Sequence, residues 1–168
     1  FHGLTASITG YKGYLRTIIS ATSDRACAYK LNLAFFEAIP GGWDLLFEVR
    51  ELIPSRCLVI ADAKRSDIGS TAQRYASMLY DQLNADAATV NPLMGSDSVE
   101  PFLEYGNHLT FLLCLTSNPG ADDFLLKDGL YKEIARKASE WSNLGNVGLV
   151  TGATRPEYLR EIREIAPD

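Results

Sequence analysis

Short runs of apolar residues alternate along the chain with longer amphipathic segments. The short runs are flanked by Pro, Gly, Asn or Asp, a pattern that predicts β-strands. The predicted strands cover residues 27–32, 57–64, 87–91, 109–116 and 147–151. The longer segments place apolar side chains at helical spacing. The predicted helices cover residues 35–49, 71–84, 98–105, 130–143 and 156–165.

The order and spacing of these elements predict consecutive β–α units. Strand centres recur at intervals of roughly 25–35 residues, which suits a strand, a helix and two short loops. The fourth strand contains the run FLLCL, and such continuously apolar strands are typical of a parallel sheet covered by helices. The last helix has a start signal, because Thr154 resembles an N-cap before Pro156 and Glu157 completes a capping box.

Two α/β architectures fit this pattern within a single domain of residues 1–168. One is the (β/α)8 TIM barrel, and the other is a doubly wound open sheet. Five strands complete a small open sheet, whereas a closed barrel typically needs about 250 residues. The spacing alone therefore slightly favours the open sheet, and the chemistry at the strand ends reverses this preference in favour of the barrel.

The composition narrows the class of protein. The 168 residues are 46% apolar and 22% charged, which is typical of a soluble globular protein. A net charge of −5 argues against a nucleic-acid binder, which normally has a basic face. No apolar run approaches the roughly 18 residues of a membrane span. The three cysteines lie in apolar runs without a Cys-x-x-Cys pair, so we expect buried thiols and a cytoplasmic protein.

Charged residues gather at the end of the second predicted strand, in the sequence DAKRSD. Side chains alternate in direction along a strand, so Asp62 and Lys64 face the same side. Asp67 follows in the loop. Charges at the end of an apolar strand are costly unless they are paired and used. This edge of the sheet is also where α/β proteins place their sites, so a functional site is predicted here.

A second lysine, Lys30, lies near the carboxyl end of the preceding strand, and Asn32 shares its face. Lys30 is therefore expected beside Asp62, in an alternating row of two lysines and two aspartates. Such a row suits a reaction that builds carbanion character, because a lysine can donate a proton while an opposed carboxylate favours loss of CO₂. Solvated strand-end charges in ordinary salt bridges are the alternative interpretation.

The segment DAKRSDIGSTAQRYA resembles the signature of orotidine 5′-monophosphate decarboxylases, in which Asp-x-Lys-x-x-Asp is followed by Ile and, three residues later, by Thr. The matching positions are Asp62, Lys64, Asp67, Ile68 and Thr71. Four other segments resemble the bacterial subgroup in the same order: AYKLNLAFFEA, TVNPLMGSDSVEPF, LCLTSNPGA and GLVTGATRPEYL. The similarity therefore extends over nearly the whole chain and implies a TIM barrel.

The resemblance also implies roles for these residues in decarboxylation without a metal or an organic cofactor. Lys64 would donate a proton to C6 of the pyrimidine, and Asp62 would oppose the substrate carboxylate. Lys30 would bind the ribose hydroxyls and anchor the charged row. The implied substrate-binding residues are Asn32, Ile68, Thr71 and Ser117, of which Ser117 would hydrogen-bond the pyrimidine ring.

The resemblance further implies a homodimer in which Asp67 crosses the interface, with Ile68 and Thr71 beside it. Family members begin with a strand that carries an Asp, and they end with a phosphate loop that contains Gln, Gly and Arg. Neither feature is found in these 168 residues. The sequence is therefore expected to cover roughly strands two to six of eight and, taken alone, to bind phosphate poorly.

Two other functions compete with this interpretation. The hexulose-phosphate synthases and keto-gulonate-phosphate decarboxylases share Asp-x-Lys-x-x-Asp but act on sugar phosphates with Mg²⁺. They lack the Ile-Gly-x-Thr continuation and the TSNPG segment found here. A non-catalytic relative is the second alternative. It would be expected to lose its buried charges first, because charges without a task reduce stability.

Overall fold

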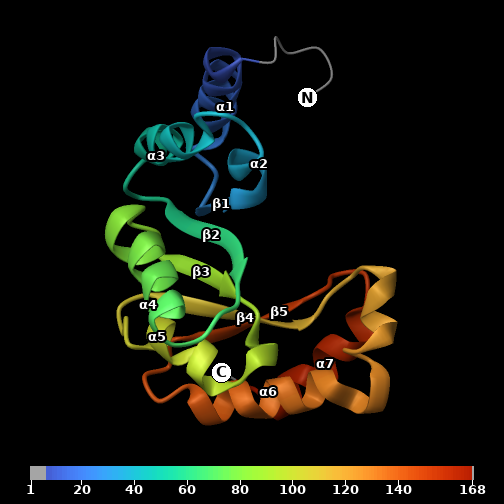
Figure 1. Cartoon of the computed structure of the whole chain (residues 1–168). Helices are drawn as coiled ribbons and strands as arrows, with labels where there is room; N and C mark the ends of the chain where they lie inside the picture. The colour runs from blue at the N-terminus through green and yellow to red at the C-terminus, as the bar shows by residue number, and fades with distance from the viewer. Residues whose placement is uncertain (1–6, 168) are drawn as a thin grey trace.

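The computed structural model describes residues 7–167. A parallel sheet of five strands runs through the molecule in the order β1-β2-β3-β4-β5 (Figure 1). The strands are β1 (Ala28–Asn32), β2 (Leu58–Arg65), β3 (Ala87–Val90), β4 (Leu109–Leu115) and β5 (Val147–Thr151). All five strands were predicted from the sequence, and their ends differ from the prediction by at most one residue.

The strand order decides between the two predicted architectures. Each strand pairs with the next one along the chain, so the order never reverses within the described residues. A doubly wound sheet reverses its strand order at a switch point, whereas a barrel adds its strands in sequence. The predicted barrel architecture is therefore confirmed, and the chain forms five consecutive units of it.

The prediction of a single helix at residues 35–49 is wrong, because this segment forms parts of two helices. They are α2 (Leu33–Glu37) and α3 (Gly42–Leu52), and Gly41 between them adopts a left-handed conformation with φ of 73°. A Cβ at Gly42 would lie 1.8 Å from the carbonyl oxygen of Phe36. The Pro-Gly-Gly turn therefore separates the two helices and lets them pack closely.

The remaining helices follow the prediction with changes at their ends. The predicted helix 71–84 is α4 (Gly69–Ser77) followed by a π-helical turn, Met78–Gln82. The predicted helix 98–105 shortens to α5 (Glu100–Leu103), and the predicted helix 130–143 becomes α6 (Leu130–Trp141). A further helix that the sequence pattern did not predict, α1 (Ile8–Thr22), precedes β1.

The last helix, α7 (Pro156–Ile165), has the predicted bounds but not the predicted cap. Arg155 occupies the N-cap position, and no side chain caps the helix there. Proline at the first helical position supplies a suitable backbone angle without a capping box. The predicted roles of Thr154 and Glu157 in capping are therefore wrong.

The two faces of the sheet have different surroundings. Core side chains from one face lie under the helices, among them Val59, Ala61, Ala88 and Leu112. The opposite face carries Lys30 and Asp62, and its Leu58 and Leu109 are 52% and 41% exposed. The described helices thus cover one face, as in a barrel whose strands turn their other face inward.

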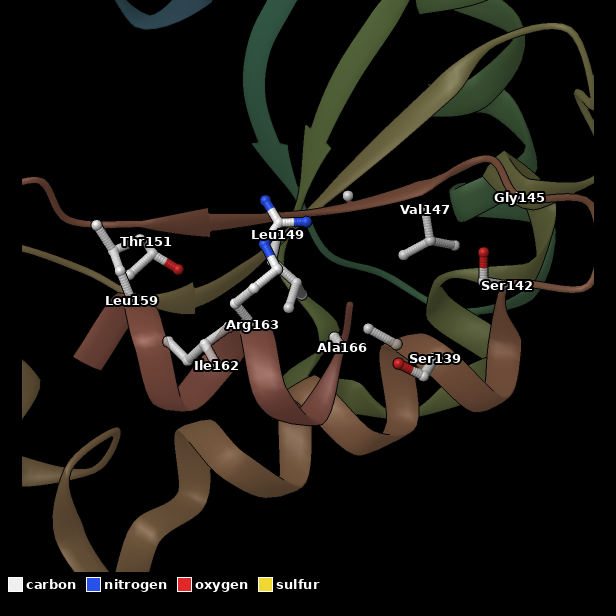
Figure 2. A pocket seen from close by; sticks show the side chains of 12 residues that line it. Ser139, Ser142, Gly145, Val147, Leu149, Thr151, Leu159, Ile162, Arg163 and Ala166 are labelled. Atoms are coloured by element: carbon white, nitrogen blue, oxygen red, sulfur yellow. The ribbon is translucent and has the colours of Figure 1, made fainter. Parts of the chain in front are cut away.

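Cavities lie beside both edge strands of the sheet. One, of about 340 Å³, is lined by residues of β5, α6 and α7. Figure 2 shows Leu149, Ile162 and Arg163 around it. The other, of about 410 Å³, lies between α1, α2 and β1 and is lined by Lys30 and Phe36 among others. Both cavities are therefore features of the open sheet edges.

Two further properties concern the surface and the cysteines. No helix in the described part of the chain is long and apolar enough to cross a membrane. Cys57 and Cys114 are buried as predicted, but Cys27 is exposed. Cys27 lies just before the first residue of an edge strand, where few neighbours cover it.

Candidate active site

Asp62 lies at the centre of a charged cluster near the carboxyl end of β2. Its side chain is 6% exposed, whereas those of Lys30 and Lys64 are 56% and 48% exposed. Lys30 Nζ lies 2.5 Å from Oδ2 of Asp62, and Lys64 Nζ lies 2.5 Å from Oδ1. The carboxylate thus contacts two ammonium groups whose side chains are partly exposed to solvent. Lys30 lies beside Asp62, as the sequence predicted.

The register of the strands brings these groups together. Asn32 pairs with Asp62 in the ladder between β1 and β2, so Lys30 comes from one strand and the carboxylate from the next. Asn32 uses its side-chain oxygen to accept a hydrogen bond of 3.2 Å from the N–H of Ala34, which caps α2. The cap fixes the point at which the chain leaves β1 beside the cluster.

A third strand contributes Thr89, which the sequence analysis missed. Its side chain is buried on β3, and its hydroxyl donates a hydrogen bond of 3.0 Å to Oδ1 of Asp62. The same hydroxyl accepts a hydrogen bond of 3.0 Å from the backbone N–H of Lys64. The alternation along β3 could have indicated that Thr89 faces the charged row, since threonine is the polar residue within AATV.

The environment keeps Asp62 ionised. Burial raises the pKa of its carboxyl, but the hydrogen bonds from Lys30, Lys64 and Thr89 outweigh this effect. The pKa therefore lies below the ordinary value of 3.8. With two cations around one anion, the cluster carries an excess positive charge that suits an anionic ligand.

The other residues of the predicted site lie at the same edge of the sheet without joining the cluster. The Asp67 carboxylate accepts a hydrogen bond of 2.8 Å from the N–H of Ile68, and among the described residues it forms no ion pair with Lys30 or Lys64. Ile68 is 50% exposed before α4, and Thr71 is exposed on that helix. The predicted row therefore contains three of its four charges within one chain.

Ser117 follows β4 and is exposed at this edge. The N–H of Gly152 donates a hydrogen bond of 2.7 Å to the carbonyl of Leu115. A Cβ at Gly152 would lie 2.8 Å from Cβ of Ser117. Glycine thus allows the end of β5 to approach the loop that carries Ser117, and this fixes the position of the serine.

The part of the chain that the structure describes contains no group of three or more His, Cys, Asp or Glu side chains arranged to hold a metal ion. The polar groups that converge here are two ammonium groups, one carboxylate and one hydroxyl. This set can hold an anion, oppose a second carboxylate and deliver a proton.

A family comparison agrees with this geometry. The model of the orotidine 5′-phosphate decarboxylase / HUMPS family matches residues 12–168, which include every residue of the cluster. This chain belongs to the orotidine 5′-phosphate decarboxylase / HUMPS family. The resemblance stated from the sequence is thereby confirmed.

Individual relatives support the family assignment. An orotidine 5′-phosphate decarboxylase of Dehalococcoides mccartyi strain BAV1 is 48% identical over 161 residues, which cover 90% of this chain. The structure of the Leishmania donovani OMP decarboxylase is 42% identical and covers 98% of this chain with a TM-score of 0.93. That of the L. donovani UMP synthase, also 42% identical, covers 97% of this chain with the same TM-score.

The chain corresponds to part of each relative. It spans 60% of the length of the Dehalococcoides protein, 68% of the Leishmania decarboxylase and 38% of the UMP synthase. The family and the fold are therefore shown for the shared part.

Proposed function

We propose that the protein to which this chain belongs converts orotidine 5′-monophosphate to uridine 5′-monophosphate and CO₂, without a metal or an organic cofactor, in pyrimidine biosynthesis. The observation that carries the proposal is the contact of Asp62 with both Lys30 and Lys64 at the catalytic edge of a barrel sheet. The family match over residues 12–168 supports it further.

The binding step uses the positive excess of the cluster. Lys30 would bind the ribose hydroxyls, and Asn32, two residues further along β1, pairs with Asp62 in the strand register. Ser117 would hydrogen-bond the pyrimidine ring from the loop after β4. These contacts would hold the substrate with its carboxylate facing Asp62, whose ionised state disfavours that arrangement in the ground state.

The chemical step follows from this placement. The bond between C6 and the carboxylate carbon breaks, CO₂ leaves, and the electron pair of the bond stays on C6. The ammonium of Lys64 then gives one proton to C6, which yields uridine 5′-monophosphate. The neutral amine regains its proton from water. Lys64 suits this role because its Nζ is held 2.5 Å from Asp62 and its side chain remains 48% exposed.

The working protein is proposed to be a homodimer that shares its active sites. Asp67 is the fourth charge of the predicted row, and it forms no ion pair with either lysine of its own chain among the described residues. Asp67 would therefore reach the Lys64 of the partner, with Ile68 and Thr71 beside it. A cytoplasmic location is proposed as well, because the three free thiols suit a reducing compartment.

The first test follows the loss of orotate absorbance when full-length protein meets the substrate in the presence of a chelator. We expect turnover by the wild type, a loss of at least about 10²-fold in Lys64→Ala, and full activity in Lys127→Ala. Lys127 is a matched control because it is an exposed lysine in a short 3₁₀ turn (Lys127–Gly129) away from the cluster. Turnover that requires Mg²⁺ would instead favour a sugar-phosphate enzyme, to be assayed with sugar phosphates.

The second test mixes Lys64→Ala with Asp67→Asn, each inactive alone. Random reassortment makes half of the dimers hybrids, and each hybrid has one site in which both residues are native. We expect the mixture to recover about one quarter of wild-type activity. If both residues of a site came from one subunit, every site would keep a defect and no activity would return.

A further inference from the structure

Thr89 links the two catalytic groups of β2 from the neighbouring strand. Its hydroxyl has one proton, and its lone pair already accepts the N–H of Lys64 at 3.0 Å. The proton therefore points to Oδ1 of Asp62, also at 3.0 Å. Oδ1 thus receives two donors, the Thr89 hydroxyl and the Lys64 ammonium, which fixes the orientation of the carboxylate plane.

The backbone at this point departs from a regular ladder. Ala61 pairs with Ala88 and Arg65 pairs with Val90, so four steps along β2 correspond to two along β3. The irregular segment contains Lys64, which has a φ of 48°. Such a left-handed conformation is unfavourable for a residue with a Cβ and persists when its surroundings hold it in place.

The Thr89 hydroxyl takes part where the ladder is interrupted. The N–H of Leu58 points to β1 and the carbonyl of Val59 points to β3, so in a regular strand the N–H of residue 64 would point to β1. The irregular segment instead turns the N–H of Lys64 toward β3, where the Thr89 side chain accepts it. Thr89 is 4% exposed, and the one proton of its hydroxyl is already donated to Asp62, so the hydroxyl has no donor left for a substrate. This placement distinguishes it from the predicted substrate-binding residues.

We propose that Thr89 is a positioning residue for the decarboxylation, acting through Asp62 and through the left-handed backbone of Lys64. The inference rests on the proposed function, because it assigns Thr89 a task in that reaction. It predicts that the hydroxyl affects the chemical step more than substrate binding.

The kinetic test compares Thr89→Val, which keeps the shape and removes the hydroxyl, with Thr89→Ser, which keeps the hydroxyl. We expect Thr89→Val to lower kcat by between about tenfold and a hundredfold, the effect of losing a hydrogen bond to a charged group. KM should stay within about twofold or fall, because the hydroxyl of the buried Thr89 is engaged by Asp62 and by the N–H of Lys64. Thr89→Ser should recover most of the lost kcat.

Thr110→Val provides a matched control. Thr110 is also a buried threonine on a strand, but its hydroxyl hydrogen-bonds Tyr80 at 3.1 Å on the helix-covered face. The Thr110→Val variant should have lower thermal stability and an unchanged kcat. If Thr89→Val behaved like Thr110→Val, with lower stability and unchanged kcat, the positioning role would be wrong. A raised KM at unchanged kcat would also contradict it.

A measurement without turnover separates this inference from the proposed function. Amide exchange at Lys64 should become about threefold to tenfold faster in Thr89→Val, and stay unchanged in Thr89→Ser and Thr110→Val. Unchanged exchange in Thr89→Val would overturn the inference even if the enzyme is a decarboxylase. A wild-type protein without turnover would overturn the proposed function and, with it, the kinetic role, while faster exchange would still establish that Thr89 holds the Lys64 backbone.

Discussion

The left-handed backbone of Lys64 predicts an unusual order of stability for two substitutions at this position. Lys64→Ala and Lys64→Gly both remove the ammonium and its contact with Asp62, so these losses cancel when the two variants are compared. They differ in the Cβ, which is unfavourable at a φ of 48°. Lys64→Gly should therefore be the more stable variant.

The magnitude follows from two opposing terms. A left-handed conformation costs a residue with a Cβ about 1–2 kcal/mol, and glycine in a strand costs about 0.5–1 kcal/mol relative to alanine. The difference favours Lys64→Gly by about 0.5–1 kcal/mol. At Lys30, which is absent from the described residues with positive φ, the order should reverse and Lys30→Ala should be more stable by a similar amount.

Urea unfolding of the four variants measures both differences. With a slope near 2 kcal/mol per molar urea, the midpoint of Lys64→Gly should exceed that of Lys64→Ala by about 0.3–0.5 M. Equal slopes are required for the comparison to hold. A Lys64→Ala variant as stable as Lys64→Gly, or more stable, would refute the claim that this backbone is strained.

Three further predictions concern stability and reactivity. Hydrogen bonds outweigh burial and hold the pKa of Asp62 below 3.8. Its ionised form therefore stabilises the fold above that pH, and this contribution is lost as the pH falls through the lowered pKa. In Asp62→Asn, the free energy of unfolding should accordingly fall less steeply with pH below about pH 4 than it does in the wild type. Gly148→Ala should lower the free energy of unfolding by about 1–3 kcal/mol, because a Cβ there would lie 2.6 Å from the Phe111 ring. In a double-mutant cycle, Phe111→Leu should relieve part of that cost. A thiol reagent at neutral pH should label the exposed Cys27 and should not label Cys114 until the protein unfolds. The reason is that burial raises the pKa of the Cys114 thiol to about 12. Rapid labelling of Cys114 in the folded protein would contradict its burial.

The sheet could be predicted from the sequence because each strand is a short apolar run with turn residues on both sides. The helices were less predictable where local backbone conformation decides their ends. Residues 35–49 have continuous helical spacing, yet Gly41 adopts a left-handed conformation and divides the segment. Spacing of apolar residues does not record such a break, although Pro40 is a local signal of it.

The charged site could be predicted in part. The period of two placed Asp62 and Lys64 on one face. Lys30 was expected beside them because it lies near the carboxyl end of the preceding strand, and both lysines do contact Asp62. Thr89 was missed because its role depends on the irregular register between β2 and β3, which no sequence period records. Asp67 forms no ion pair with either lysine among the described residues. Its proposed place across a dimer interface comes from the family resemblance, because strand periodicity carries no information about a second subunit.

The most direct test of the proposed activity is the release of labelled CO₂ from orotidine 5′-monophosphate carrying the label in its carboxylate, measured with metal-stripped full-length protein. The account predicts one CO₂ for each uridine 5′-monophosphate formed, at a rate that added Mg²⁺ does not change and that falls by at least about 10²-fold in Lys64→Ala. No release by the folded wild-type protein, or release that depends on Mg²⁺, would contradict it.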